Sequence, residues 1–268
     1  MPDWYLATEM VFVGLVGGLL GGFLGIAGSV LFIPAMVFLG GLDYHTAQAS
    51  ALVVNVFVGA SGVYGHWKSG KVMPEMLRVL IPCAMVASVG GVLVSNLFTA
   101  EDQVWLRRIF GLSIAYVWVV NFYRLIRTLR PKTDGDPPWL RGGPRLGVVR
   151  VGFVGVIMGS AAGLLGISGG SIVVPAQQVV LGLRIRTAAA NSAMAVIFAS
   201  LLAGVVKFWT APSGLDAHQA MSYAALLIPP AAIGSFIGSH VTHKVRRNVV
   251  RIAFLSLLVW TIYKMLLG

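Results

Sequence analysis

The sequence predicts an all-α integral membrane protein with two inverted repeats, each made of a glycine-turn helical hairpin and three transmembrane helices. Three observations lead to this prediction. The chain of 268 residues is 57% hydrophobic and 11% charged, with a mean hydropathy of +0.84, whereas a soluble domain is about 25% charged. A glycine-rich apolar segment of the first half recurs in the second half. The basic residues cluster between the apolar stretches.

Six apolar stretches have the length of a single crossing, because a helix needs about 20 residues to span the hydrocarbon core. They lie at residues 44–66, 75–98, 104–123, 187–210, 220–241 and 249–267. Two further stretches, 11–40 and 148–182, are too long for one straight helix, and both have glycines midway. We therefore expect each of these two stretches to fold back on itself as a helical hairpin.

The duplication appears as a match without gaps. Residues 22–34 (GFLGIAGSVLFIP) align on residues 163–175 (GLLGISGGSIVVP) at an offset of 141 residues. Between the halves, residues 128–147 are rich in proline and basic residues, which is typical of a solvated linker. The predicted organisation is a first repeat, a linker and a second repeat, at residues 1–127, 128–147 and 148–268.

The net charge of +11 would suggest a nucleic-acid partner in a soluble protein. Here the basic residues lie in the loops, as the positive-inside rule requires, so no nucleic acid is expected. With the linker in the cytoplasm, all but four of the 20 Lys and Arg residues fall inside; the four are Arg107, Arg108, Lys207 and Lys264. We predict a multi-pass protein of the cell (inner) membrane with its N-terminus outside. Each half then makes three net crossings, so the second half is inverted.

After each glycine turn, a short helix is predicted to begin, near Ser29 and near Gly170. The first N–H groups of such a helix are free and its dipole is positive there. Two inverted hairpins would aim both ends at a common midplane site, which suits an anion. The candidate substrate-binding residues are Gly25, Ala27, Gly28, Ser29, Ser50, Gly166, Ser168, Gly169, Gly170, Ser171 and Asn191.

Some glycines have a second interpretation, close packing of helices through small residues. Gly14, Gly18 and Gly22 fit that pattern, as do Gly234 and Gly238.

Polar residues on the helices after the hairpins either bind substrate or hold helices together. These residues are Gln48, Ser50, Asn55, Asn191 and Ser192. Ser50 and Asn191 are favoured for the site because they match at the repeat offset.

The nine acidic residues all lie outside the predicted span centres, and the chain has one cysteine. A carboxylate proton relay or a cation site in the membrane is therefore not expected. No catalytic cluster is visible, so we expect neither an enzyme nor a cofactor nor a metal site. His66 and Lys207 also match at the repeat offset; both lie near helix ends, where we expect them to snorkel to the interface.

The paired glycine motifs, together with residues 46–52 (TAQASAL) and 61–66 (SGVYGH), resemble the TauE/SafE family of sulfite and organosulfonate exporters. The resemblance covers nearly the whole chain and includes the duplication. It implies export of a small sulfur-containing anion, such as sulfite or sulfoacetate.

The chain departs from the family's usual run of three glycines, with Ala27-Gly28-Ser29 in the first motif and Ser168-Gly169-Gly170 in the second. The expected partners are a small anionic substrate and the lipid bilayer. A homo-oligomer, another small anion as substrate, and a non-transporting membrane subunit or assembly factor all stay open.

Overall fold

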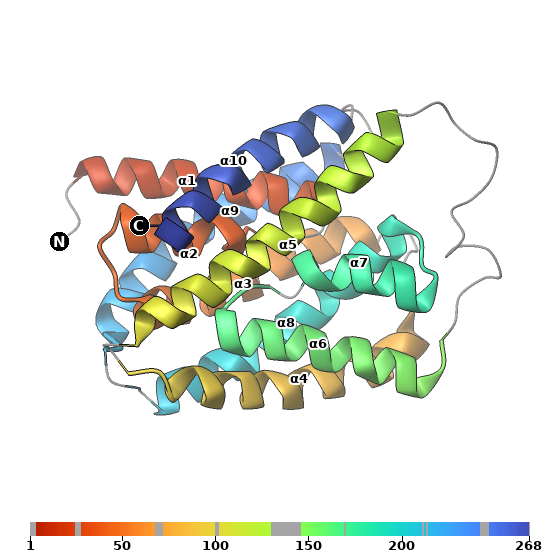
Figure 1. Cartoon of the computed structure of the whole chain (residues 1–268), viewed down its shortest axis with the longest axis horizontal. Helices are drawn as coiled ribbons and strands as arrows, with labels where there is room; N and C mark the ends of the chain where they lie inside the picture. Colours follow the sequence, from red (N-terminus) through yellow and green to blue (C-terminus); the bar gives the residue numbers. More distant parts are fainter. Residues whose placement is uncertain are drawn as a thin grey trace.

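The fold class is confirmed as all-α. The computed structural model describes residues 4–24, 28–67, 72–99, 102–129, 146–168, 170–210, 212, 214–241 and 247–267, and these residues form ten helices and no strand (Figure 1). The helices are α1 (Trp4–Leu24), α2 (Ser29–Phe38), α3 (Tyr44–Trp67), α4 (Pro74–Asn96), α5 (Gln103–Leu129), α6 (Val148–Leu165), α7 (Gly170–Leu181), α8 (Ile185–Thr210), α9 (Ala217–Val241) and α10 (Arg247–Leu267).

Each of the two long apolar stretches is a pair of helices. The first contains α1 and the 10-residue α2, and the second contains α6 and the 12-residue α7. Helices as short as α2 and α7 cannot cross a bilayer. As predicted, the short helices begin at Ser29 and Gly170.

Six of the described helices are long and apolar enough to cross a membrane, namely α1, α3, α4, α6, α8 and α9. The sequence also predicts α5 and α10 as spans, and their lengths of 27 and 21 residues allow a crossing. Two helices exceed the expected bounds by more than three residues: α1 begins at Trp4, and α5 continues to Leu129, into the predicted linker. Arginine and leucine are good helix formers, which favours the continuation of α5 past residue 123. A proline disfavours the helical conformation of the residue before it, and the sequence has a proline at position 131.

The helices of one half pack on those of the other half. α1 lies along α9, α4 lies along α6, and α3 contacts both α8 and α9. On α1, a Cβ atom at Gly18 or Gly22 would overlap the carbonyl oxygen of Ala231 or Ser235 on α9. The close-packing interpretation of these glycines is thus correct, and it holds equally for Gly234 and Gly238, whose Cβ atoms would meet the α1 backbone.

The α6–α4 contact is built in the same way. A Cβ atom at Gly159 or Gly163 would overlap the carbonyl oxygen of Ala84 or Ser88 on α4. These two glycines lie 141 residues after Gly18 and Gly22, the offset of the sequence repeat.

Two hydrogen bonds are also matched between the halves, although the two serines that donate them lie 147 residues apart. The Ser235 hydroxyl of α9 donates to the Val58 carbonyl of α3 over 3.0 Å, and the Ser88 hydroxyl of α4 donates to the Ala199 carbonyl of α8 over 3.1 Å. The two halves therefore interlock through matched contacts.

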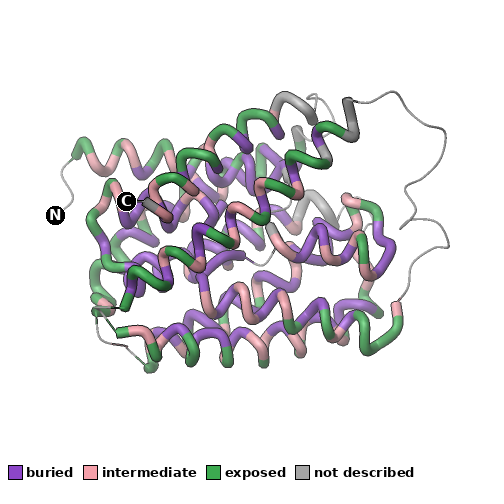
Figure 2. Tube along the Cα trace, in the orientation of Figure 1, coloured by how far each residue is buried: buried purple, intermediate pink, exposed green. Residues whose placement is uncertain are grey.

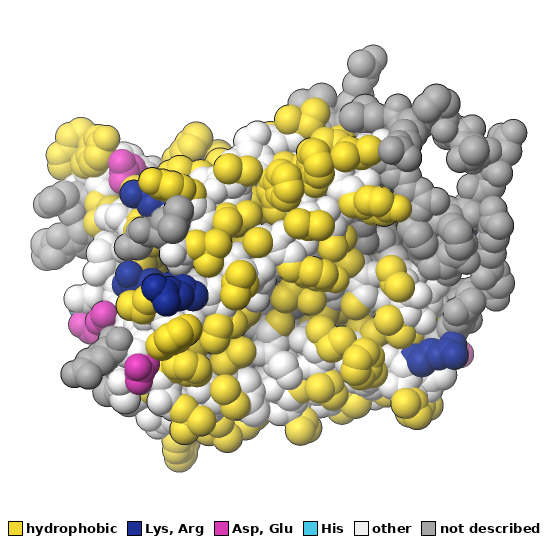
Figure 3. All heavy atoms as spheres, viewed as in Figure 1, with side chains coloured by type: hydrophobic (Ala, Val, Ile, Leu, Met, Phe, Trp, Pro, Cys, Tyr) yellow, Lys and Arg dark blue, Asp and Glu magenta, His cyan; other side chains and the backbone are white. Residues whose placement is uncertain are grey.

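Charged and apolar side chains are separated on the surface. On the face in Figure 3, Lys, Arg, Asp and Glu side chains lie at the two ends of the helices, with hydrophobic side chains between them. The start of α1 and the end of α10 lie at one end, and the end of α5 and the start of α6 lie at the other (Figure 1). Figure 2 shows exposed positions on the outward sides of these helices and buried positions on the sides facing inward. This distribution fits a multi-pass protein with helices crossing the bilayer.

Candidate functional site

The tips of the two hairpins touch inside the protein. The backbone N–H of Ser168, between α6 and α7, donates to Ser29 Oγ at the start of α2 over 2.8 Å. The two hydroxyl oxygens lie 3.2 Å apart, and both residues are fully buried. Two segments 139 residues apart in sequence thus meet where both short helices begin, as the hairpin interpretation predicts.

The two turns use glycine for different physical reasons. Gly166 ends α6 with φ = 71°, a left-handed conformation that glycine adopts at little cost. Gly28 has φ = −72°, which any residue adopts, but a Cβ atom there would lie 2.6 Å from the carbonyl carbon and oxygen of Gly17. The first turn therefore needs glycine for close approach to α1, and the second needs it for backbone conformation.

The C-terminal end of α6 is held by polar side chains of α3. The Gln48 amide donates to the carbonyls of Gly163 and Leu164 over 2.7 and 3.0 Å. The Tyr44 hydroxyl donates to the Leu165 carbonyl over 3.0 Å, and the Asn55 amide donates to the Gly166 carbonyl over 3.1 Å. The last carbonyls of a helix have no partner within it, so this α3 clamp (Tyr44, Gln48 and Asn55) satisfies four of them and fixes the second tip.

The clamp has a signal in the sequence, although the predicted site does not include its residues. Gln48 and Asn55 are polar residues within a predicted span, and Tyr44 begins the same span. The spacings of four and seven residues place all three side chains on one face of a helix. At the repeat offset, α8 has Ile185, Ala189 and Val196, so the clamp has no polar counterpart on α8.

Two predicted site residues lie away from these contacts. The Asn191 carbonyl oxygen accepts the backbone N–H of Met73, just before α4, and its amide donates to Thr187. The Ser50 hydroxyl is buried and has no hydrogen-bond partner in the described structure. Asn191 thus holds the start of α4, and the substrate role of both residues stays a prediction.

Three of the predicted site residues, Gly25, Ala27 and Gly169, lie outside the described residues. Gly170 begins α7 as expected, and the side chain of Ser171 is likewise outside the described part of the structure.

Lys207 does not snorkel, contrary to the sequence prediction. Its side chain is fully buried, and its Nζ atom lies 2.8 Å from His45 Nδ1 and 2.7 Å from Asn96 Oδ1. The prediction considered only the position of Lys207 near a helix end, whereas α3 and α4 cover that end of α8. The side chain of His66, the residue matched to Lys207, is outside the described part of the structure.

The interior around the tips suits an anion better than a cation. No side chain caps the N-terminus of α2 at Gly28, so its dipole remains available to a negative charge. Among the described residues, no Asp or Glu is buried. A buried acidic residue would repel an anion in a medium of low dielectric constant, so their exclusion from the described interior lowers the cost of anion entry.

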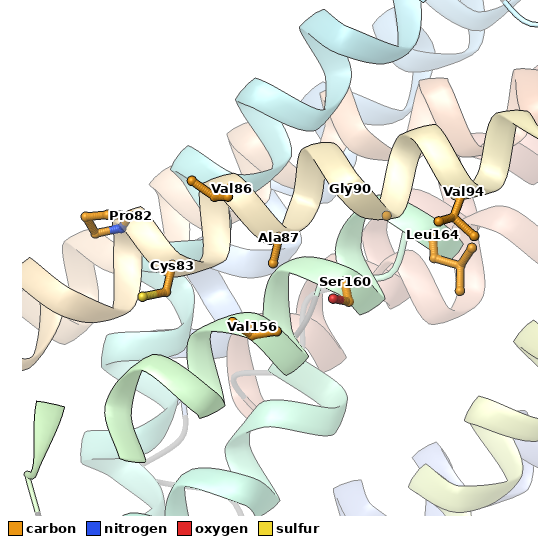
Figure 4. Close-up of a pocket in the computed structure, with 10 residues that line it drawn as sticks. Pro82, Cys83, Val86, Ala87, Gly90, Val94, Val156, Ser160 and Leu164 are labelled. Atoms are coloured by element: carbon orange, nitrogen blue, oxygen red, sulfur yellow. The ribbon is translucent and has the colours of Figure 1, made fainter. Parts of the chain in front are cut away.

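A cavity of about 680 Å³ lies elsewhere, between α4 and α6 (Figure 4). Apart from Ser160, its labelled lining is apolar, and Val86 on its wall is 75% exposed. Such a lining gives a small anion no charge and, in Ser160, a single hydroxyl donor, so we do not assign the site there. The space beside Gly28 is too small to hold a water molecule, and the 2.8 Å bond from Ser168 to Ser29 joins the two tips in a closed arrangement.

The fold and this site define a class: multi-pass helical membrane proteins in which two glycine-turn hairpins meet in the interior. The family model described as "Sulfite exporter TauE/SafE" matches residues 10–265, and the chain belongs to this family.

Relatives of this chain have names that agree with the family. It is 24% identical over 261 residues to the "Probable membrane transporter protein YunE" of Bacillus subtilis (strain 168), covering 90% of each chain. It is 26% identical to a "Probable membrane transporter protein" of Haemophilus influenzae, covering 87% of this chain and 84% of the relative. It is 27% identical to the "Probable membrane transporter protein MamO" of Magnetospirillum gryphiswaldense, covering 85% of this chain but only 39% of MamO. No solved structure matches the chain significantly.

Proposed function

We propose that this protein exports a small sulfur-containing anion, such as sulfite or an organosulfonate, through a midplane site between the two hairpin tips. The observation that carries the proposal is the buried contact between Ser29 and Ser168, at the starts of α2 and α7. Irregular backbone at membrane depth is tolerated where it is buried or lines a cavity. Helix N-termini at such a place attract anions. The family supports transport, and its name supports sulfite as the substrate.

The closed tips must separate for an anion to bind. An anion that takes the Ser168 N–H and the Ser29 hydroxyl as donors replaces the bond that now joins them. Oxygen atoms of a sulfonate or sulfite accept such bonds, and a charged acceptor strengthens them. Substrate and tip contact therefore compete for the same donors.

Inverted repeats supply the motion in this proposal. The matched packing of α1 on α9 and α6 on α4 supports two halves related by duplication, and in Figure 1 α1 and α6 run in opposite directions. The proposed topology has the N-terminus outside and the linker in the cytoplasm. Rocking of the halves would then open the tips first to one side and next to the other.

The driving force in this proposal is the membrane voltage. A cell interior is negative, so an exported anion moves with the field and gains about 2.3 kcal/mol per charge per 100 mV. We expected the positive potential of the interior to come from helix N-termini alone, because Lys207 was predicted to snorkel to the interface. The structure corrects that point, because Lys207 is fully buried.

The test is uptake of labelled sulfite or sulfoacetate into proteoliposomes with an imposed voltage and no proton or sodium gradient. Uptake should follow the voltage and its sign. Uptake that requires a proton gradient and does not depend on voltage contradicts the proposal that the membrane voltage drives transport. Absence of flux for a panel of sulfur oxyanions and other small anions contradicts transport itself and favours a membrane subunit or assembly factor.

A further inference from the structure

Among the described residues, Lys207, buried near the end of α8, has three hydrogen-bond partners, and none of them is acidic. Its Nζ atom is 2.8 Å from His45 Nδ1, 2.7 Å from Asn96 Oδ1 and 3.3 Å from Ser95 Oγ. These partners come from α3 and α4. A buried charge among neutral groups is unfavourable, and replacement by an apolar residue would avoid that cost. The residue therefore calls for an explanation beyond stability.

Two of the partners can only accept from Lys207. The Asn96 amide nitrogen donates to Thr210 Oγ1 over 2.7 Å, and that hydroxyl donates to the Val206 carbonyl. The Asn96 oxygen therefore faces Lys207. The Ser95 hydroxyl donates its hydrogen to Gln48 Oε1 over 3.0 Å, so its lone pair faces Lys207.

His45 closes the arrangement from the other side. Its Nε2 atom lies 2.8 Å from the Phe98 carbonyl oxygen, so Nε2 carries a hydrogen, and Nδ1 faces the Lys207 amine. The two side chains make four contacts that each require one hydrogen: three around the amine and one to Phe98. A neutral lysine supplies two such hydrogens and a neutral histidine supplies one. The total of three is one hydrogen fewer than the four contacts need. All four contacts are hydrogen bonds at the same time only with one extra proton on the pair, on either nitrogen.

A chain of hydrogen bonds links this proton to the second hairpin tip. Lys207 donates to Ser95, Ser95 donates to Gln48, and Gln48 donates to the carbonyls of Gly163 and Leu164. All these bonds run in one direction, and bonds arranged this way polarise and strengthen one another. The chain ends in the last turn of α6, directly before the turn that contacts Ser29.

We propose that Lys207 and His45 share one proton, and that this proton holds the α6–α7 tip, through Ser95 and Gln48, in the position that binds the anion. The anion part of this inference rests on the proposed function. Lys207 is then a positioning residue, because it acts on the tip through other side chains. The proton stays in the protein and is not transported.

The other titratable groups at this end lie at or near the surface, away from the hydrogen bonds of the pair. Among them are Glu9 on α1, Asp43 before α3, Asp102 before α5, Arg107 and Arg108 on α5, Asp216 before α9, His218 on α9 and Lys264 on α10. At this end of the described chain, the buried titratable side chains that contact this network are Lys207, His45 and Tyr44 of the clamp. As the pH rises, loss of the shared proton removes one of the four contacts and loosens the tip.

The first measurement is uptake of labelled isethionate, a sulfonate whose charge is constant, by proteoliposomes between about pH 6 and about pH 10. Uptake by the wild type should fall about tenfold at alkaline pH, because loss of one hydrogen bond to a charged group changes an equilibrium by about that factor. Lys207→Arg should remove this loss, because a guanidinium keeps its proton throughout. Lys264→Gln, which removes a basic residue near the end of α10, is the matched control and should follow the wild type.

The second measurement does not require transport. Hydrogen exchange of residues 163–168, corrected for intrinsic rates, should show loss of protection at alkaline pH in the wild type and in Lys264→Gln, but not in Lys207→Arg. Ser95→Ala leaves Lys207 and His45 in place but interrupts the hydrogen bonds between Lys207 and Gln48. It should therefore remove the pH dependence of tip protection. A wild-type protein that takes up no isethionate at any pH contradicts the proposed substrate class, while exchange still decides the proton's role.

Two results would overturn the inference. One is tip protection in the wild type that does not change with pH. The other is a loss of tip protection at alkaline pH, in Ser95→Ala or in folded Lys207→Arg, that equals the loss in the wild type. If Lys207→Arg does not fold, exchange in Ser95→Ala gives the decision.

Discussion

Gly28→Ala tests whether the first tip is a site or only a packing contact. The added Cβ would lie 2.6 Å from two backbone atoms of Gly17 and would overlap the Phe32 ring. Backbone atoms cannot turn aside as a side chain can, so the start of α2 must shift by several tenths of an ångström. Overpacking of this kind costs about 1–3 kcal/mol. Because Ser29 follows directly, the shift also breaks its 2.8 Å bond to Ser168.

The expected result is a fall in uptake of labelled sulfite or sulfoacetate of roughly fivefold to roughly 150-fold, the factor to which that cost corresponds. Gly90→Ala on α4 is the matched control, because a Cβ atom there meets nothing within 4 Å. Alanine at that helical position is favoured over glycine by about 1 kcal/mol, so this variant should transport as the wild type does and unfold at an equal or higher temperature.

Uptake should be measured in proteoliposomes with an imposed voltage, and the melting temperature should be measured in detergent. The decisive comparison is uptake per folded protein. Wild-type uptake in well-folded Gly28→Ala would refute the reasoning, because the tip would then tolerate displacement. A fall that tracks the loss of folded protein alone would make Gly28 a packing residue.

The remaining predictions concern the clamp, the tip contact and the topology. Gln48→Leu leaves two α6 carbonyls unpaired and should destabilise the protein by about 1–4 kcal/mol, seen as a lower melting temperature; an unchanged value would mean that the clamp contributes no stability. Ser29→Ala removes the acceptor for Ser168 and should weaken sulfite binding more than expression, measured by calorimetry and membrane yield; unchanged affinity would remove Ser29 from the site. Asn191→Ala should reduce folded yield by loosening the start of α4 and leave the affinity of the folded fraction unchanged; weaker affinity would instead support the substrate role predicted from the repeat. Cysteines placed near Asp43 should label from outside and cysteines near Arg184 from inside, in a background without the native cysteine; labelling of both from one face would contradict the inverted repeat.

The sequence predicted those features of the fold that depend on one physical rule. Span lengths and midway glycines predicted both hairpins, and the starts of α2 and α7 followed from where the glycine turns end. The small-residue spacing on α1 and α9 correctly indicated close packing. These features depend on local sequence and on the thickness of the bilayer.

The sequence failed where the partner is distant in the chain. Lys207 was expected at the interface because its own helix ends nearby, and only the fold places His45 and Asn96 around its amine. Likewise, Tyr44 reads as an aromatic residue at a helix start, yet its hydroxyl caps a carbonyl 121 residues away. Which side chains satisfy the end of a helix depends on tertiary packing, and one sequence does not reveal that packing.

The one-sided clamp has a consequence for how this chain could have arisen and how it can be rebuilt. A dimer of two identical half-length chains would carry both clamps or neither, whereas here Tyr44, Gln48 and Asn55 correspond to Ile185, Ala189 and Val196 at the matched positions. Within one chain, each half can carry side chains that the other half lacks. A chain rebuilt from two copies of residues 148–268 would therefore leave the carbonyls at the end of α6 without these partners, while two copies of residues 1–127 would bring a clamp to both tips. Because the clamp is present in one half alone, the two halves of this protein are not exchangeable.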